Sequence, residues 1–371
     1  MSWRKSTDPD WSDELHALLL LRMLPGYCDN QIADLLQQHS PQQLLARPEL
    51  LGRPAHALTT PQIQKRCANA YRAMQRLDVS VITIHDPEYP SRLRILGGEA
   101  PAMLFARGNT ELLNTPMVAV IGARNSTEYG DSVAQQLAGD LARRSVTILS
   151  GLALGIDGVA HRAALSEGGN TIAVLGCGID VSYPPSHARL QERIAQDGLL
   201  LSEFAPGTPA MRHQFPKRNQ IIATLPAGVL VIEAGPRSGT RKTVDRALLS
   251  QVEVFAVPGP IGRYESQGTN EIIQQGAHLV THVRDVLEGL KWIEVPAENE
   301  AECDVVEDNT LSGPARTVFS KLDATARHVD AIARACSLGT TETLVLLTEL
   351  ELDGYVVQHS GKRFSRPPIV T

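Results

Sequence analysis

Short apolar runs recur through the middle of the chain, and each ends in a turn of small residues followed by a helical pattern. The runs occupy residues 117–121, 146–149, 171–175, 229–232 and 254–257. Because their hydrophobicity is continuous rather than alternating, both faces of each strand must be covered, as in a parallel sheet. The repeated order of strand, glycine turn and helix predicts an α/β fold with an extended, Rossmann-like, doubly wound parallel sheet. The carboxyl ends of its strands share one edge, where backbone N–H groups and helix N-termini favour phosphate.

Two further regions flank this sheet domain, which we place at residues 81–292. Residues 1–80 contain leucines at helical spacing, which predict a helical domain, and Pro25-Gly26 ends its first helix. This unit resembles a helix-hairpin-helix or SAM-like domain, which binds a DNA backbone or packs against another domain. Its turn contains no lysine or arginine, so packing is the favoured role.

The C-terminal region changes character after an acidic stretch at residues 293–310, which we interpret as a linker. Residues 311–371 then show three helical patterns and a short hairpin, the order of a winged-helix domain. The third helix, at 340–352, is acidic and apolar, which argues against deep reading of a DNA major groove. The segment HSGKRFSR at 359–366 is basic, so protein docking and DNA-backbone contact both remain open.

Composition narrows the class of protein without identifying it. The chain of 371 residues carries a formal net charge of −6, so binding to DNA requires a local basic patch on an acidic body. Its five cysteines are scattered and never spaced CxxC, which disfavours disulfides and a zinc site. No apolar signal core follows the N-terminus, and we expect a cytoplasmic protein with no membrane segment.

The first two glycine turns indicate a surface for an anion rather than for a nucleotide cofactor. Gly122 permits close backbone approach, and Arg124 follows where a phosphate would lie. The GxGxxG pattern is incomplete, and the second strand ends in Ser150-Gly151 instead of an acidic ribose ligand. With Gly155, these small residues keep the second turn open to a ligand backbone. We therefore predict no cofactor.

Asp157 and His161 lie one helical turn apart after the second glycine turn. Such a pair can bind a metal or act as acid and base, but no third ligand is evident. A helix-face ion pair or a buried hydrogen bond is the favoured interpretation. We predict neither a metal site nor a catalytic residue.

The segment from Phe215 to Asn219 contains the most informative local pattern. Lys217 and Arg218 stand at the start of an apolar helix, where two cations oppose the helix dipole unless an anion binds. An aromatic ring beside cations is typical of proteins that hold single strands without reading their sequence. We expect both cations to face solvent and to contact DNA phosphates.

A fourth turn, at Ser238-Gly239-Thr240, opens another helix and offers backbone and hydroxyl donors to an anion. Lys242 and its neighbouring arginines add positive charge. Four such turns on one sheet edge predict a shared surface that follows phosphates.

The ordered motifs VAVIGARNSTEYG, SGLALGIDGVAH, SEFAPG, FPKRNQIIA, VIEAGPRSGT and VFAVPG resemble those of the DprA/Smf family of bacterial DNA-processing proteins. The similarity covers nearly the whole sheet domain. It implies a protein that binds and protects single-stranded DNA, without catalysis or a cofactor. It also implies loading of the RecA recombinase onto that strand during natural transformation in competent cells, and homodimers formed through the Rossmann-like domain.

By motif position, the resemblance implies a set of DNA contacts. Phosphate contacts are assigned to Arg124, Lys217, Arg218 and Asn219, and base contact to Phe215. The other residues of the expected anion pocket are Gly122, Ser150, Gly151, Gly155, Ser238, Gly239 and Thr240.

The sequence departs from the family pattern at a few positions. Leu154 and Gln220 stand where the family usually has arginine. The segment RKTVDRA, which includes Lys242, is more basic than usual. We expect that the basic track has moved or that its affinity differs.

Two other functions remain open. Rossmann-like phosphoribohydrolases cleave nucleoside monophosphates with a glutamate in a PGGxGTxxE-like turn, and the comparable segment here, GPRSGTRKTVD, has no such glutamate. The third hypothesis is a winged-helix regulator that reads duplex DNA, and the acidic helix at 340–352 weighs against it.

Overall fold

The computed structural model describes residues 4–5, 12–27, 29–292, 313–323 and 326–366. These residues form two compact units. The first comprises Met1–Ser126 with Ala134–Lys291, and the second comprises Thr127–Val133 with Trp292–Thr371. The stretch interpreted as an acidic linker, 293–310, lies outside the described residues.

A ten-stranded sheet organises the first unit, with the strand order β1-β2-β3-β7-β6-β5-β4-β8-β9-β10. The strands from β7 to β10 run parallel to one another, whereas β1, β2 and β3 extend the β7 side in antiparallel fashion. The sheet is therefore mainly parallel, as predicted. The strands are β1 (Arg4–Lys5), β2 (Ser80–Thr83), β3 (Met103–Gly108), β4 (Met117–Ile121), β5 (Thr147–Ser150), β6 (Thr171–Leu175), β7 (Leu199–Ser202), β8 (Gly228–Val231), β9 (Glu253–Ala256) and β10 (His278–Leu279).

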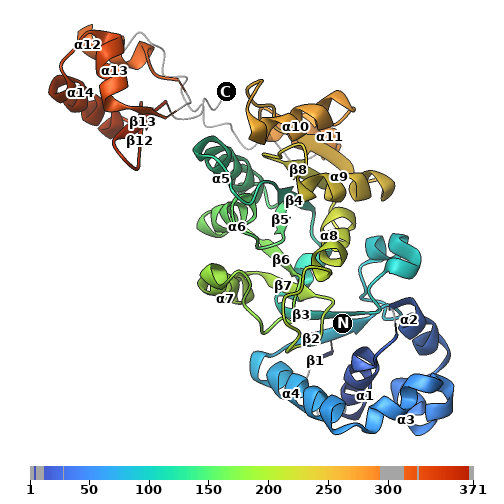
Figure 1. The fold of residues 1–371 in the computed structure, drawn as a ribbon. Helices are drawn as coiled ribbons and strands as arrows, with labels where there is room; N and C mark the ends of the chain where they lie inside the picture. The colour runs from blue at the N-terminus through green and yellow to red at the C-terminus, as the bar shows by residue number, and fades with distance from the viewer. Residues whose placement is uncertain (1–3, 6–11, 28, 293–312, 324–325, 367–371) are drawn as a thin grey trace. The chain divides into compact units, whose positions relative to one another are not determined.

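Helices cover both faces of this sheet (Figure 1), and the strands from β4 to β8 are buried along their length. On one face lie α5 (Glu128–Arg143), α6 (Ile156–Ser166) and α7 (Ala188–Asp197). On the other lie α8 (Gln214–Thr224) and α9 (Gly239–Leu249). Two later helices, α10 (Tyr264–Gln274) and α11 (Val283–Gly289), follow β9 and β10. This double cover explains why the strands read as continuous apolar runs.

One parallel strand, β7, was not predicted from the sequence. β7 consists of three leucines and Ser202, and it follows α7 after the single residue Gly198. The run is shorter than the others, and no glycine turn follows it directly. Ser202 is nevertheless fully buried, because its hydroxyl donates to the carbonyl oxygen of Cys177 at 2.7 Å.

The N-terminal region is helical, as predicted, and shares a core with the sheet. Its helices are α1 (Ser12–Met23), α2 (Asp29–Gln38), α3 (Pro41–Ala46) and α4 (Pro61–Leu77). In α4 the buried residues Ile63, Cys67, Ala70 and Met74 recur at helical spacing. Leucines of α1 belong to the same apolar cluster as Met103 and Phe105 of β3. Packing is thus the role of this region that the contacts support.

The second unit contains the predicted winged-helix elements. They are α12 (Gly313–Ser320), β11 (Arg327–His328), α13 (Val329–Cys336), α14 (Thr340–Leu352), β12 (Val357–His359) and β13 (Arg363–Ser365). The three strands form a separate antiparallel sheet in the order β11-β13-β12. Across the described part of the chain, none of the helices is both long enough and apolar enough to cross a membrane.

Candidate nucleic-acid interface

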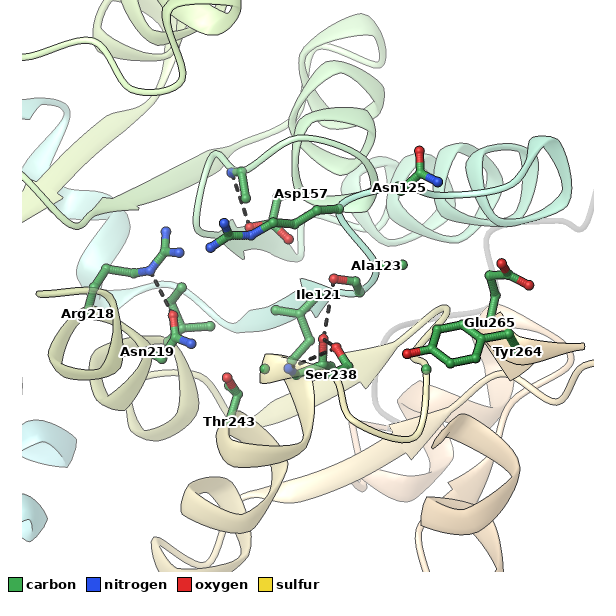
Figure 2. A pocket seen from close by; sticks show the side chains of 17 residues that line it. Ile121, Ala123, Asn125, Asp157, Arg218, Asn219, Ser238, Thr243, Tyr264 and Glu265 are labelled. Carbon is green, nitrogen blue, oxygen red and sulfur yellow. Dashed lines mark hydrogen bonds between the residues drawn. The ribbon is translucent and has the colours of Figure 1, made fainter. Parts of the chain in front are cut away.

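A surface cavity lies where the winding of the sheet changes direction. From β4 the chain adds β5, β6 and β7 on one side, and it then returns to add β8, β9 and β10 on the other. Ligands of doubly wound sheets bind at the carboxyl ends of the strands, at such a switch point. Here a cavity of about 480 Å³ opens between the loops after β4, β5 and β8 and the starts of α9 and α10 (Figure 2).

Seven of the thirteen residues assigned to the DNA site line this cavity: Gly122, Arg124, Arg218, Asn219, Ser238, Gly239 and Thr240. Arg124 is exposed, and no described residue forms an ion pair with it. It is therefore available to an anionic ligand. These seven residues come from three of the four predicted turns, the first, the third and the fourth, which therefore meet at one sheet edge.

The start of α9 supplies the hydrogen-bond donors of the cavity. Ser238 is the N-cap of this helix, and its hydroxyl accepts from Thr240 N at 3.2 Å. Thr240 Oγ1 donates to the carbonyl oxygen of Gly122 at 3.3 Å, which ties the loop after β8 to the loop after β4. The remaining first-turn N–H groups of a helix have no partner within the helix and favour an anion.

Arg218 is not solvent-facing, contrary to the sequence prediction. It is 4% exposed, and its guanidinium donates to the carbonyl oxygens of Gly151 and Val174, the latter at 3.0 Å. Its Nε donates to Asn219 Oδ1 at 2.9 Å. Arg218 thus forms the inner wall of the cavity, where its charge acts on a ligand while most of its donors are already used.

Asp157 and His161 do not pair with each other. Asp157 Oδ2 accepts from the backbone N–H groups of Gly151 and Ala153 at 3.2 and 3.3 Å. Burial raises the pKa of Asp157, and the positive charge of Arg218 partly offsets this effect. His161 Nδ1 instead lies 2.7 Å from Thr171 Oγ1. Burial lowers the pKa of this imidazole to about 3, so it is neutral at neutral pH.

The small residues of the second turn serve packing rather than an open anion pocket. Ser150 is fully buried and donates to the carbonyl oxygen of Val120 at 2.7 Å. A Cβ on Gly151 would lie 2.1 Å from Arg218 Nη1. Gly155 has φ +73°, and a Cβ there would lie 2.3 Å from the carbonyl oxygen of Ala123. Neither Ser150 nor Gly155 lines the main cavity.

Phe215 lines a second, smaller cavity of about 50 Å³, together with Arg124 and Gly151. The guanidinium carbons of Arg124 and Arg218 each lie 5.6 Å from the centre of its ring. Tyr183, which the sequence analysis did not assign to the site, lies beside it with ring centres 5.4 Å apart. Tyr183 is 43% exposed, so two rings and two cations stand together at this end of the sheet edge.

Lys217 and Lys242 line neither cavity. Lys217 is directed toward the N-terminal helices, where its Nζ lies 3.1 Å from Asp29 Oδ2. Lys242 is exposed on α9. The two lysines therefore stand outside the groups that converge on the cavity.

Sequence analysis missed the contribution of α10. Tyr264 and Glu265, in the first turn of this helix, line the main cavity together with Asn125. They belong to the segment 262–280, whose sequence predicts a loop, a short helix and a last strand without assigning any of them to the site. A tyrosine next to a glutamate between a Pro-Gly turn and an apolar helix was the only available signal.

Comparison with known proteins gives matches to both units. The family model for DNA recombination-mediator protein A matches residues 80–291, and the model for the DprA winged helix domain matches residues 306–362. Protein Smf of Escherichia coli is 40% identical over 278 residues, which cover 74% of each chain. DNA processing protein DprA of Streptococcus pneumoniae is 48% identical over 189 residues, 51% of this chain and 67% of that protein.

Solved structures agree with these sequence matches. The X-ray structure of DprA from Streptococcus pneumoniae aligns with a TM-score of 0.62 and 36% identity, covering 74% of this chain and 97% of that one. DNA processing protein A from Helicobacter pylori, in a structure that describes its single-stranded DNA binding mode, aligns with a TM-score of 0.52 and 33% identity. That alignment covers 57% of this chain and 96% of the other. With both domains matched in order, the chain belongs to the DprA/Smf family of DNA recombination-mediator proteins.

Proposed function

We propose that this protein binds single-stranded DNA along the carboxyl edge of its sheet and delivers the strand to the RecA recombinase. The observation that carries the proposal is the exposed Arg124 beside the α9 N-terminus, with the ring of Phe215 next to it. This arrangement combines a cation and backbone donors for phosphate with an aromatic face for a base. The Helicobacter pylori relative, whose single-stranded DNA binding mode has been described, supports the same substrate.

The geometry favours a single strand over a duplex for a simple reason. A base can stack on Phe215 or Tyr183 only after it has left its neighbours in a double helix, and in a single strand that step costs little. Phosphate is then bound by Arg124 and by the N–H group of Gly239 in the first turn of α9. Neither interaction depends on base identity, so these contacts hold strands of any sequence.

We infer that the protein acts without catalysis. Asp157, a carboxylate in the main cavity, is occupied by two backbone N–H groups and lies near Arg218, which does not suit a general base. Incubation with nucleoside monophosphates tests this inference. Release of free base at a rate above that of a heat-inactivated sample would favour the phosphoribohydrolase alternative.

Fluorescence anisotropy of a labelled oligothymidylate across a salt series tests DNA binding. We expect tight binding at low salt that weakens steeply as salt rises, since bound phosphates release counterions. A duplex of the same length should bind much more weakly. Equal affinity for the single strand and the duplex would indicate that the winged-helix domain binds the DNA. Absence of binding at low salt would refute the proposal.

Delivery to RecA is tested separately. RecA ATPase activity on a single strand coated with single-stranded DNA-binding protein should start earlier when this protein is present. The proposal includes a homodimer formed through the sheet domain, which sedimentation of the full chain tests. A normal lag in the presence of protein that binds the strand would leave DNA binding intact and eliminate the loading step.

A further inference from the structure

The end of the main cavity away from Arg218 is built by the first turn of α10 (Figure 2). Two backbone hydrogen bonds fix this turn to the loop after β8: Ala234 N donates to Glu265 O, and Gly268 N donates to Ala234 O, both at 2.8 Å. A Cβ on Gly268 would lie 2.6 Å from Ala234 O, so the contact requires a glycine. The side chains of this turn therefore have a fixed position at the cavity wall.

Tyr264 presents an open aromatic surface at this wall. The tip of its ring lies against Gly235, where a Cβ would be 2.4 Å from Tyr264 Cε1. The residue is nevertheless 58% exposed, and no other ring or guanidinium group of the described chain stacks on it. Its hydroxyl end is directed into the cavity (Figure 2). A ring held from one side and open on the other is suited to stack a planar ligand.

Glu265 places a carboxylate at the same end of the cavity. It is half-buried, and among the described residues none donates a hydrogen bond to its side chain or forms an ion pair with it. A negative charge in this position repels phosphate, whereas Arg124 and the α9 N-terminus attract it. The cavity therefore has a part that attracts phosphate and a part, formed by Tyr264 and Glu265, that repels phosphate and favours a planar ligand with hydrogen-bond donors.

We propose that Tyr264 and Glu265 form a base-recognition subsite that distinguishes bases with an exocyclic amino group from thymine. The inference rests on the proposed binding of single-stranded DNA. The nucleotide whose phosphate binds at Ser238–Thr240 stacks its base on Tyr264, and the amino group of that base donates to Glu265. Guanine fits best, because its N1–H and N2–H₂ groups are adjacent and match the two carboxylate oxygens. Thymine presents no amino group and leaves the carboxylate unpaired.

Competition anisotropy with a series of matched strands tests the subsite. Each strand is a short oligothymidylate with one central nucleotide replaced by dG, dA, dC or deoxyinosine, which is guanine without the N2 amino group. We expect the dG strand to bind about fivefold more tightly or better than the unsubstituted strand, the lower end of discrimination by one bidentate pair. Deoxyinosine should lose most of that gain.

Two pairs of variants separate the roles of the two residues. Glu265→Gln should remove the preference for dG, whereas Glu111→Gln, an exposed charge at the opposite edge of the sheet before β4, should keep it. Tyr264→Ala should weaken every strand by about five- to 150-fold, the range for one base stacked on an aromatic ring. Tyr264→Phe should restore most of the affinity lost in the alanine variant.

Direct evidence of stacking comes from 2-aminopurine at the central position of the strand. Its fluorescence should be quenched on binding to the wild type and to Tyr264→Phe, but not to Tyr264→Ala. Equal affinity for the dG and unsubstituted strands, or a dG preference that survives in Glu265→Gln, would overturn the subsite and leave single-strand binding in place. Failure of the wild type to bind any strand would instead refute the proposed function itself.

Discussion

Lys217 and Asp29 connect two parts of the chain that are far apart in sequence: Lys217 Nζ on α8 lies 3.1 Å from Asp29 Oδ2 at the start of α2. Asp29 is buried, and its Oδ1 lies 3.6 Å from Arg22 Nη2. Burial acts to raise the pKa of Asp29, but Arg22, Lys217 and hydrogen bonds outweigh it, so the pKa lies below its ordinary value. The carboxylate is therefore charged at neutral pH, and Lys217 helps to hold the helical region against the sheet.

Replacing Asp29 by asparagine should destabilise the protein by about 1–3 kcal/mol, the cost of leaving a partly buried charged partner unsatisfied. Arg22 and Lys217 would lose their shared counter-charge, although Lys217 is half-exposed and partly returns to water. Urea unfolding of the full chain measures the change. Asp34→Asn, an exposed site on the same helix, is the matched control and should change little. An equal loss in both variants would contradict this role for Asp29.

Glu203 gives the same cluster a dependence on pH. It is 3% exposed, and its Oε1 has no hydrogen-bond partner among the described residues. Burial and the nearby charge of Asp29 raise the pKa of Glu203 to about 7, while Lys217 and Arg22 act in the opposite direction. Between pH 4.5 and 7 the folded protein therefore binds more protons at this site than the unfolded chain does.

Stability should accordingly fall as pH rises through this window, because ionised Glu203 is buried while the unfolded chain ionises freely. The total change contributed by this group is about 3 kcal/mol, from a shift of this size at about 1.4 kcal/mol per pH unit. Glu203→Gln should flatten the profile between pH 5 and 7 in urea unfolding. Glu111→Gln, at an exposed site, should leave the slope in place. A wild-type profile that rises over this range would show that Glu203 is ionised throughout.

Arg218→Ala should unfold more readily, by about 3–5 kcal/mol, as expected when one partner of a buried charged group is removed. The variant loses the hydrogen bonds to Gly151 and Val174 and leaves Asp157 without its nearby cation. Thermal unfolding measures the effect, and Lys242→Ala on the exposed face of α9 should stay close to wild type. If Arg218→Ala is as stable as the wild type and only binds DNA less tightly, Arg218 contacts DNA directly, as the sequence predicted.

Arg124→Ala should behave in the opposite way. Because Arg124 is exposed and unpaired among the described residues, its loss should leave thermal unfolding unchanged. Affinity for a single strand should fall by about 10- to 100-fold, the worth of one charged hydrogen bond. The slope of log K against log salt should become shallower by about 0.7, the value for one phosphate on a single strand. Arg144→Ala, an exposed arginine at the far end of α5, is the control, and a slope that is unchanged in Arg124→Ala would place the phosphate elsewhere.

The apolar runs predicted the sheet because a strand that is buried on both faces needs apolar residues at consecutive positions. β4 and β6 have the predicted bounds, and β5, β8 and β9 differ only at their ends. The side-chain directions at the start of α8 were harder to predict. Neighbouring positions on a helix point about 100° apart, so Lys217 and Arg218 cannot both face the same ligand. Which of them turns inward depends on how α8 packs against β6 and the loop after β5.

The contribution of Tyr264 and Glu265 could not have been predicted from local patterns. These residues reach the cavity because the start of α10 pairs with Ala234 through backbone hydrogen bonds. The amino-acid sequence does not indicate which backbone groups pair in this way. Gly151 and Gly155 were assigned to the second glycine turn from the sequence, but as residues that leave space for a ligand. Gly151 makes room for an arginine of the protein itself rather than for a ligand.

The position of β4 has a consequence for the timing of synthesis. Its two neighbours are β5, which follows it closely, and β8, which the ribosome makes only after β6, β7 and α8. A nascent chain that ends before Gly228 therefore lacks one whole wall of the cavity, and its last wall arrives with Tyr264. A growing polypeptide thus has no complete site with which to capture DNA. The proposed DNA site is therefore complete only after the start of α10 has been synthesised.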